Sequence, residues 1–151
     1  MNNYFRQKAL TVSQQDHHMR LRFSQFRATT NHGNRIVWRG LLQPTPWSEC
    51  YQIEIVYQIP QRPQIRVLAP GLRIRSGCKK CPHTFEDGSL CVHQSHEWNA
   101  KLLIATTIVP WISMWLYFYE VWLRTGAWRG EGTHPQLPEH SPLPAARAAA
   151  A

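Results

Sequence analysis

The sequence predicts one α+β domain, in which a long buried helix covers one face of an antiparallel sheet. Two patterns carry this prediction. Short segments within residues 35–68 alternate apolar and polar side chains and are separated by turn residues, as expected for strands that bury a single face. Residues 99–123 are apolar on nearly every side, as expected for a helix buried against that face. With 151 residues, 43% of them hydrophobic, the chain is long enough to bury such a core without disulfides.

The first predicted element is an N-terminal helix within residues 8–26. Apolar residues recur there among Gln, Asp and His, and Ser13 is placed to cap the helix. The turn residues at positions 29–34 (TTNHGN) then end this helix, or end a short strand that follows it.

Three further strands are predicted in residues 35–42, 50–59 and 64–68. The first places Ile36 and Trp38 on one face. The second alternates most clearly, and its apolar face consists of Tyr51, Ile53, Ile55 and Tyr57. Prolines separate these strands and no insert is long enough for a crossover helix, so we expect a four-stranded antiparallel meander.

The long apolar segment has two interpretations. From Leu102 to Tyr119, 18 residues contain no Asp, Glu, Lys or Arg, which is the lower limit for a helix that spans a bilayer. Pro110 within the segment and Glu120 at its end favour a buried core helix over a single-pass membrane protein. Pro110 is expected to break the segment into a short helix followed by a longer one, and Gly126 is placed to end the second.

Basic residues are concentrated in the first half of the chain. Residues 1–80 hold 13 Lys and Arg against 3 Asp and Glu, whereas residues 81–151 hold 4 against 6, for a net charge of +8. The basic charges are scattered singly and form no tract, so we predict a solvated surface and no nucleic-acid partner. The first 16 residues have no charged region followed by an apolar core, which predicts a cytoplasmic protein.

The end of the chain differs in composition from the rest. Residues 136–151 (QLPEHSPLPAARAAAA) contain prolines, no apolar periodicity and an alanine run. We therefore predict a domain over residues 1–135 and a disordered tail over residues 136–151.

Residues 82–93 (PHTFEDGSLCVH) lie between the strands and the long helix and hold the candidate nucleophile. Cys91 follows the turn signal Asp87-Gly88, and reactive groups are often carried on such loops. A free thiol has a pKa of about 8.5, and a nearby histidine increases the ionised fraction near neutral pH. The nearest histidines in the sequence are His83, His93 and His96. The alternative interpretation of Cys91 is a buried core cysteine.

The cysteines also suggest a zinc site. Cys78 and Cys81 form a C-x2-C pair that can supply two thiolates, and Cys91 with His93 or His83 could complete the ligand set. The C-x-H spacing of the second half departs from the usual zinc patterns. Structural zinc is therefore the weaker hypothesis, and no metal or other cofactor is predicted.

Several blocks of the sequence carry a resemblance to a known family. They are WRGLLQPT (residues 38–45), SECYQIEIVY (48–57), HTFEDGSLCVH (83–93), EWN (97–99) and the segment 104–135. Over about residues 8–135 the chain resembles ubiquitin-conjugating enzymes, and more closely the short E2-like proteins of bacterial CBASS anti-phage operons. The resemblance implies the ubiquitin-conjugating fold: an N-terminal helix, a meander, a cysteine loop and a long buried helix.

The same resemblance implies a function and a partner. Cys91 would accept an acyl group as a thioester and pass it to an amine. The expected cargo is the C-terminal tail of a cGAS/DncV-like nucleotidyltransferase. A homodimer is compatible with the resemblance. The alternative is a non-catalytic binding module that docks on the nucleotidyltransferase through the basic first half.

The resemblance also suggests helpers for Cys91. Eukaryotic relatives carry a His-Pro-Asn signature, whose asparagine is thought to steady the oxyanion, and a gapless count places His83 at that position. An imidazole N–H can donate to an oxyanion as an amide can. The alternative role of His83 is to hold the loop. Asp87 would polarise the incoming lysine amine or, the safer interpretation, form the turn with Gly88.

Overall fold

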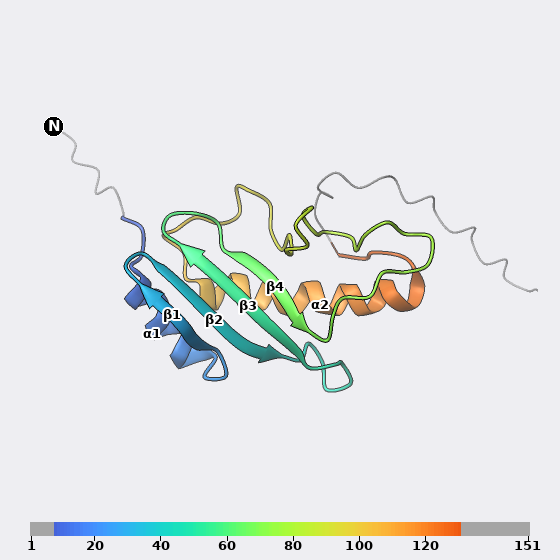
Figure 1. The fold of residues 1–151 in the computed structure, drawn as a ribbon, viewed down its shortest axis with the longest axis horizontal. Helices are drawn as coiled ribbons and strands as arrows, with labels where there is room; N and C mark the ends of the chain where they lie inside the picture. The colour runs from blue at the N-terminus through green and yellow to red at the C-terminus, as the bar shows by residue number, and fades with distance from the viewer. Residues whose placement is uncertain (1–7, 131–151) are drawn as a thin grey trace, which may run out of the picture.

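The computed structural model describes residues 8–130. In chain order the elements are α1 (Val12–Arg22), β1 (Arg27–His32), β2 (Arg35–Leu42), β3 (Tyr51–Gln58), β4 (Gln64–Ala69), the 3-10 helix η1 (Ile104–Thr106) and α2 (Ile108–Thr125) (Figure 1). The strands form one antiparallel sheet in the order β1-β2-β3-β4, which confirms the predicted α+β meander. The predicted tail lies outside the described residues.

The cap of α1 differs from the prediction. Thr11 precedes the helix, its hydroxyl accepts a hydrogen bond from the Gln14 backbone N–H, and the Gln14 side chain accepts one from the Thr11 N–H. This reciprocal capping box satisfies two N–H groups that the first turn leaves without helical partners. Ser13 lies inside the helix, so its assignment as the cap was wrong. Gln14, three residues after Thr11, completes the capping box and thereby makes Thr11 the cap.

The sheet buries one face, as the alternation predicted. Ile36 and Trp38 are fully buried in β2, and alternate residues of β3 are buried from Tyr51 to Tyr57. In the β2–β3 register, Trp38 lies opposite Ile55. Burying one such side chain contributes about 1.5–3 kcal/mol to stability. The buried face of the sheet therefore supplies much of the driving force for folding.

Helix α2 completes the core on that face. It runs behind the sheet in Figure 1, and its buried residues belong to the same hydrophobic cluster as those of β2 and β3. The helix starts at Ile108, so Pro110 lies in its first turn, where the missing N–H costs no helical hydrogen bond. The prediction that Pro110 breaks the helix was wrong, because the chain breaks earlier, at Thr107. Gly126 ends α2 with φ of 78°, as predicted.

No helix within residues 8–130 is both long and apolar enough to cross a membrane.

The connection from β4 toward the predicted nucleophile is fastened to the end of α2. The Arg75 guanidinium donates to the carbonyl oxygens of Trp122 (3.3 Å) and Leu123 (2.7 Å), which lie in the last helical turn. The Arg73 N–H donates to the Tyr119 hydroxyl at 2.6 Å. A cation at a helix C-terminus is favourable and satisfies carbonyls that lack helical partners. The chain therefore reaches the end of α2 before it returns to β4 with residues 82–91.

Candidate active site around Cys91

The segment that carries Cys91 is a short hairpin, which we call the cysteine hairpin (residues 83–91). Thr84 and Leu90 form an isolated antiparallel bridge, and the Phe85 N–H donates to the Ser89 carbonyl at 2.8 Å. The Leu90 N–H donates to the Ile65 carbonyl of β4 at 2.9 Å. The backbone that carries Cys91 is thus attached to the edge of the sheet.

Asp87 lies at the tip of this hairpin, away from the thiol. Its carboxylate accepts hydrogen bonds from the Ser89 N–H (2.9 Å) and the Ser89 hydroxyl (2.6 Å), an arrangement typical of an Asx turn. It also accepts from Gln64 at 2.7 Å and forms an ion pair with Arg66 at 3.2 Å, both on β4. The bonds from Ser89, with smaller contributions from Gln64 and Arg66, lower the pKa of Asp87. The carboxylate ties the hairpin tip to β4.

His83 begins the hairpin and is 4% exposed. Its carbonyl oxygen accepts hydrogen bonds from the Cys91 N–H at 2.8 Å and from the Trp115 indole N–H at 3.0 Å. Its backbone has φ of 51°, a left-handed conformation that is uncommon outside glycine but that histidine, asparagine and aspartate adopt more often than other residues. The imidazole lies against Trp128, with ring centroids 4.7 Å apart. Both the backbone and the ring of His83 are therefore fixed.

Trp128 reaches His83 because the chain turns back after α2. Beyond Gly126 the segment folds over the helix and places the Trp128 ring 5.4 Å from that of Trp115. Gly130 permits this packing, since a Cβ at that position would lie 2.7 Å from ring atoms of Trp128 and Phe118. The sequence contains no local signal for the contact between Trp128 and His83, because the two residues lie 45 positions apart.

The Cys91 thiol is half-buried. Its sulfur lies 3.6 Å from the His93 carbonyl oxygen. Burial raises the pKa of the Cys91 thiol, and Glu97 raises it further, while the positive charge of Arg62 acts in the opposite direction. The balance favours the neutral thiol near pH 7, so reaction requires a proton acceptor or a charge change when a substrate arrives.

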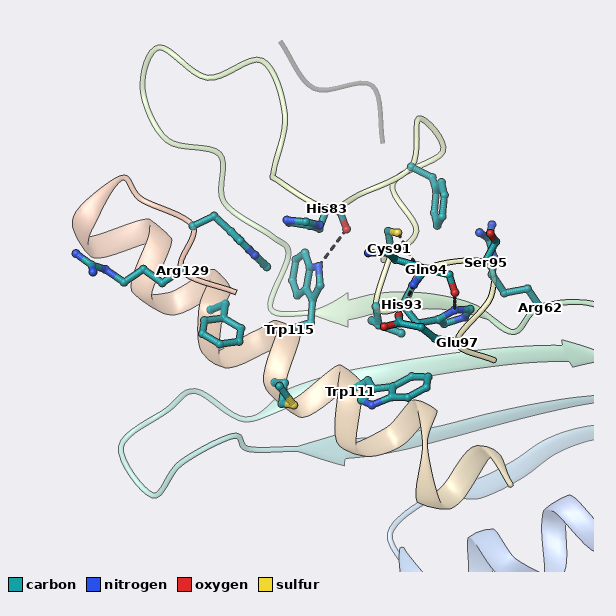
Figure 2. A pocket seen from close by; sticks show the side chains of 15 residues that line it. Arg62, His83, Cys91, His93, Gln94, Ser95, Glu97, Trp111, Trp115 and Arg129 are labelled. Carbon is teal, nitrogen blue, oxygen red and sulfur yellow. Dashed lines mark hydrogen bonds between the residues drawn. The ribbon is translucent and has the colours of Figure 1, made fainter. Parts of the chain in front are cut away.

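A pocket of about 930 Å³ opens beside the thiol (Figure 2). Cys91 and His83 both line it, whereas Asp87 does not. The remaining lining residues are Arg62, Phe85, Val92, His93, Gln94, Ser95, Glu97, Trp111, Met114, Trp115, Phe118, Trp128 and Arg129. The structure therefore brings two of the three predicted site residues together at one cavity.

One side of the pocket is supplied by α2. We call this side the α2 wall; it consists of Trp111, Met114, Trp115 and Phe118. These residues follow the i, i+3, i+4, i+7 spacing that places side chains on one helical face. That stripe is visible in the sequence, but the same spacing is typical of core residues, so the sequence predicts a helix buried in the core. The α2 wall, Arg62 and Trp128 were not predicted as parts of the site.

The other cysteines lie outside this pocket. Cys81 is buried, and burial together with the nearby Cys78 raises its pKa to about 12. Cys78 is partly exposed and Cys50 exposed, and all four cysteines are free thiols. Within residues 8–130, no three His, Cys, Asp or Glu side chains are grouped so that they could hold a metal ion.

Comparison with known proteins gives a match to one family. The model of the family described as Type II CBASS E2 protein matches residues 15–135. The matched range includes the whole sheet, the cysteine hairpin and α2. No curated protein matches the chain.

Proposed function

The chain belongs to the Type II CBASS E2 family, and from this premise we propose that it is a ubiquitin-conjugating-like acyl carrier that works through Cys91. Family membership implies a role in ubiquitin-like conjugation during bacterial anti-phage defence. We propose further that Cys91 forms a thioester with the C-terminus of a cGAS-like nucleotidyltransferase and passes it to an amine. One observation supports this proposal. A pocket of about 930 Å³ opens beside Cys91, and the hairpin that carries this cysteine is hydrogen-bonded to the edge of the sheet.

The proposed chemistry has two steps. The Cys91 thiolate attacks the carbonyl carbon of a carboxyl group that arrives already activated; a C–S bond forms and the activating group leaves with its electron pair. An amine then attacks the thioester carbonyl, an amide forms, the amine nitrogen loses a proton and the thiolate leaves. Covalent catalysis of this kind replaces one difficult step by two easier ones. The arrangement of helix, meander, hairpin and long helix is the one we assign to the ubiquitin-conjugating fold.

We assign His83 two roles in this scheme. Its carbonyl oxygen, which accepts from the Cys91 N–H, makes it a positioning residue for the nucleophile. His83 also lines the pocket, and we propose that its imidazole N–H donates to the oxyanion that forms at the acyl carbon. Asp87 is assigned a positioning role, because its hydrogen bonds to Ser89 and Gln64 hold the hairpin tip on β4.

A second candidate function is a non-catalytic module that binds the nucleotidyltransferase. It is favoured by the outer face of the sheet, where Arg27, Arg35 and Arg39 are exposed. Of these, Arg39 pairs with Glu54 at 2.7 Å. Charge reversal at Arg35 would abolish phage protection under this hypothesis, whereas Cys91→Ala would leave protection unchanged.

The decisive experiment combines the full chain, the partner nucleotidyltransferase and a source of the activated C-terminus. Wild-type protein is expected to form an adduct that dithiothreitol cleaves, and Cys91→Ser to form either a dithiothreitol-resistant ester or no adduct. Cys50→Ser, which changes an exposed thiol outside the pocket, serves as the matched control and retains the adduct. An undiminished dithiothreitol-sensitive adduct with Cys91→Ala would contradict the proposal.

A further inference from the structure

We propose that the pocket beside Cys91 is a specificity site for the cargo tail, and that it selects a large apolar side chain accompanied by acidic residues just before the C-terminal carboxyl. This inference rests on the proposed function. It adds the chemical class of the cargo to the assignment of Cys91 as the acceptor. Three observations carry it: the apolar α2 wall, the balance of charge around the pocket, and the position of the thiol between them.

The side chains of the α2 wall are more exposed to solvent than those of a helix face that packs only in the core. Trp115 is buried, but Met114 is 56% exposed, and Trp111 and Phe118 are partly exposed. Trp128 packs on Phe118 with ring centroids 6.2 Å apart and extends the apolar surface beyond the helix. Aromatic and methionine side chains that line an open pocket are typical of sites that accept an apolar anchor.

The charge around the pocket is positive. Arg62 and Arg129 line it against the single carboxylate of Glu97. The Arg62 guanidinium lies 4.1 Å above the Phe85 ring, a cation–π contact that holds the charge on the side of the pocket nearest β4. Figure 2 shows Arg62 and Arg129 on opposite sides of the view, with Cys91 between them. Acidic residues in a bound tail would meet a cation at either side.

The position of the thiol identifies the occupant. Cys91 and the α2 wall line the same cavity, so a chain that occupies this cavity with its carboxyl carbon at the sulfur lies beside this wall. A glycine-only tail would leave the apolar surface uncovered, and a basic tail would meet Arg62 and Arg129. A tail with one aromatic or large aliphatic residue and flanking carboxylates covers the wall and pairs with the two arginines.

Binding without chemistry provides the first test. The probe is a synthetic hexapeptide amide with one phenylalanine, two acidic residues and a terminal glycine, titrated into full-length Cys91→Ala protein by calorimetry. We expect Met114→Lys to weaken binding about tenfold or more, as for a central contact. Tyr117→Lys is the matched control, because Tyr117 is 44% exposed on the same helix but does not line the pocket. Equal weakening by both changes, or equal affinity for a peptide with glycine in place of phenylalanine, would overturn the inference.

The charge requirement is tested in the same assay. Arg62→Glu should weaken the acidic peptide and strengthen a version with two lysines, whereas Arg124→Glu, an exposed change in the last turn of α2, should alter neither. Binding of adenosine monophosphate in place of the peptide, with the same sensitivity to Met114→Lys, would assign the pocket to a nucleotide and overturn the inference.

The second test links the pocket to the reaction. The same peptides, prepared as C-terminal thioesters, acylate Cys91 by thiol exchange, in which one C–S bond forms as another breaks and the small thiol departs; intact mass reports the product. Wild-type protein should react faster with the phenylalanine peptide; Met114→Lys should lose that preference, whereas Tyr117→Lys, outside the pocket, should keep it. Failure of every peptide to acylate Cys91, with binding intact, would contradict the proposed function alone. Acylation without preference among the peptides would contradict the specificity site alone.

Discussion

The carbonyl oxygen of His83 lies 2.8 Å from the backbone nitrogen of Cys91 and accepts its hydrogen bond. Two of the three site residues predicted from the sequence are therefore joined through the backbone across the base of the cysteine hairpin. The Trp115 indole donates to the same oxygen at 3.0 Å from the other side. The nucleophile is thus positioned by the helix that also forms the apolar side of its pocket.

Trp115→Phe should loosen this arrangement. The change removes the indole donor and should lower the free energy of unfolding by about 1 kcal/mol through the lost hydrogen bond, with a further loss from reduced packing. Acylation of Cys91 should slow as the hairpin loses one of its anchors. Trp122→Phe is the matched control, because that indole is equally buried and its N–H has no hydrogen-bond partner among residues 8–130. Chemical denaturation and acylation rates measure both effects; equal slowing of acylation by the two changes would contradict the positioning role.

The reactivity of Cys91 should depend on pH in a manner set by two neighbours. Because burial raises its pKa, the alkylation rate with iodoacetamide should reach half its maximum above the value of about 8.5 for a free thiol. Arg62→Gln removes a charge that lowers the pKa, so the midpoint should rise; Glu97→Gln removes one that raises it, so the midpoint should fall. Identical midpoints in wild-type protein and both variants would show that these charges do not act on the thiol.

Whether the sequence predicts a part of this site depends on how far apart in the chain its interacting residues lie. Cys91, His83 and the turn at Asp87 lie within nine residues of one another, so local turn chemistry predicts the turn and the loop that carries Cys91. The Trp115 hydrogen bond spans 32 residues and exists only because α2 packs under the hairpin. No periodicity in the sequence distinguishes a helical stripe that faces a pocket from one that faces the core.

The same distinction applies to the fold. The strands could be predicted because alternation is a property of a few adjacent residues, and Ile36 and Trp38 are buried as expected. The start of α2 could not, because a proline suits the first turn of a helix as well as a break. Only the packing of the preceding segment, in which Gln15 of α1 binds the Ile104 N–H at 2.9 Å, decides between these outcomes.

Cys81 should make stability fall at alkaline pH. Its pKa is raised from about 8.5 in the unfolded chain to about 12, so the unfolded state loses the thiol proton first. Stability from this group is complete below about pH 8.5 and declines as the pH rises toward 12, with a limiting slope of about 1.4 kcal/mol per pH unit. Cys81→Ala should reduce the decline between pH 8.5 and 10, measured by urea unfolding at each pH. Cys50→Ala, at an exposed thiol, should leave the decline unchanged, and an equal decline in Cys81→Ala would assign it to other groups.

Asp87→Asn separates the two roles suggested for that carboxylate. An asparagine can still accept from the Ser89 N–H, but it loses the charge that pairs with Arg66. If Asp87 positions the hairpin, formation of the thioester and its reaction with a lysine amine should slow by a similar small factor. A selective loss of the second reaction, measured by single-turnover discharge of preformed thioester, would instead assign Asp87 to activation of the amine.

The last prediction concerns the ring of His83. Asparagine tolerates the left-handed backbone at this position and carries an amide donor, so His83→Asn should preserve the hairpin and most of the acylation rate. His83→Gly also tolerates the backbone but has no side-chain donor. If the imidazole stabilises the oxyanion, the glycine variant should acylate about a hundredfold or more slowly than the asparagine variant, while iodoacetamide, which reacts without a tetrahedral oxyanion, should alkylate Cys91 equally in both. Equal acylation rates in the two variants would restrict His83 to positioning the nucleophile.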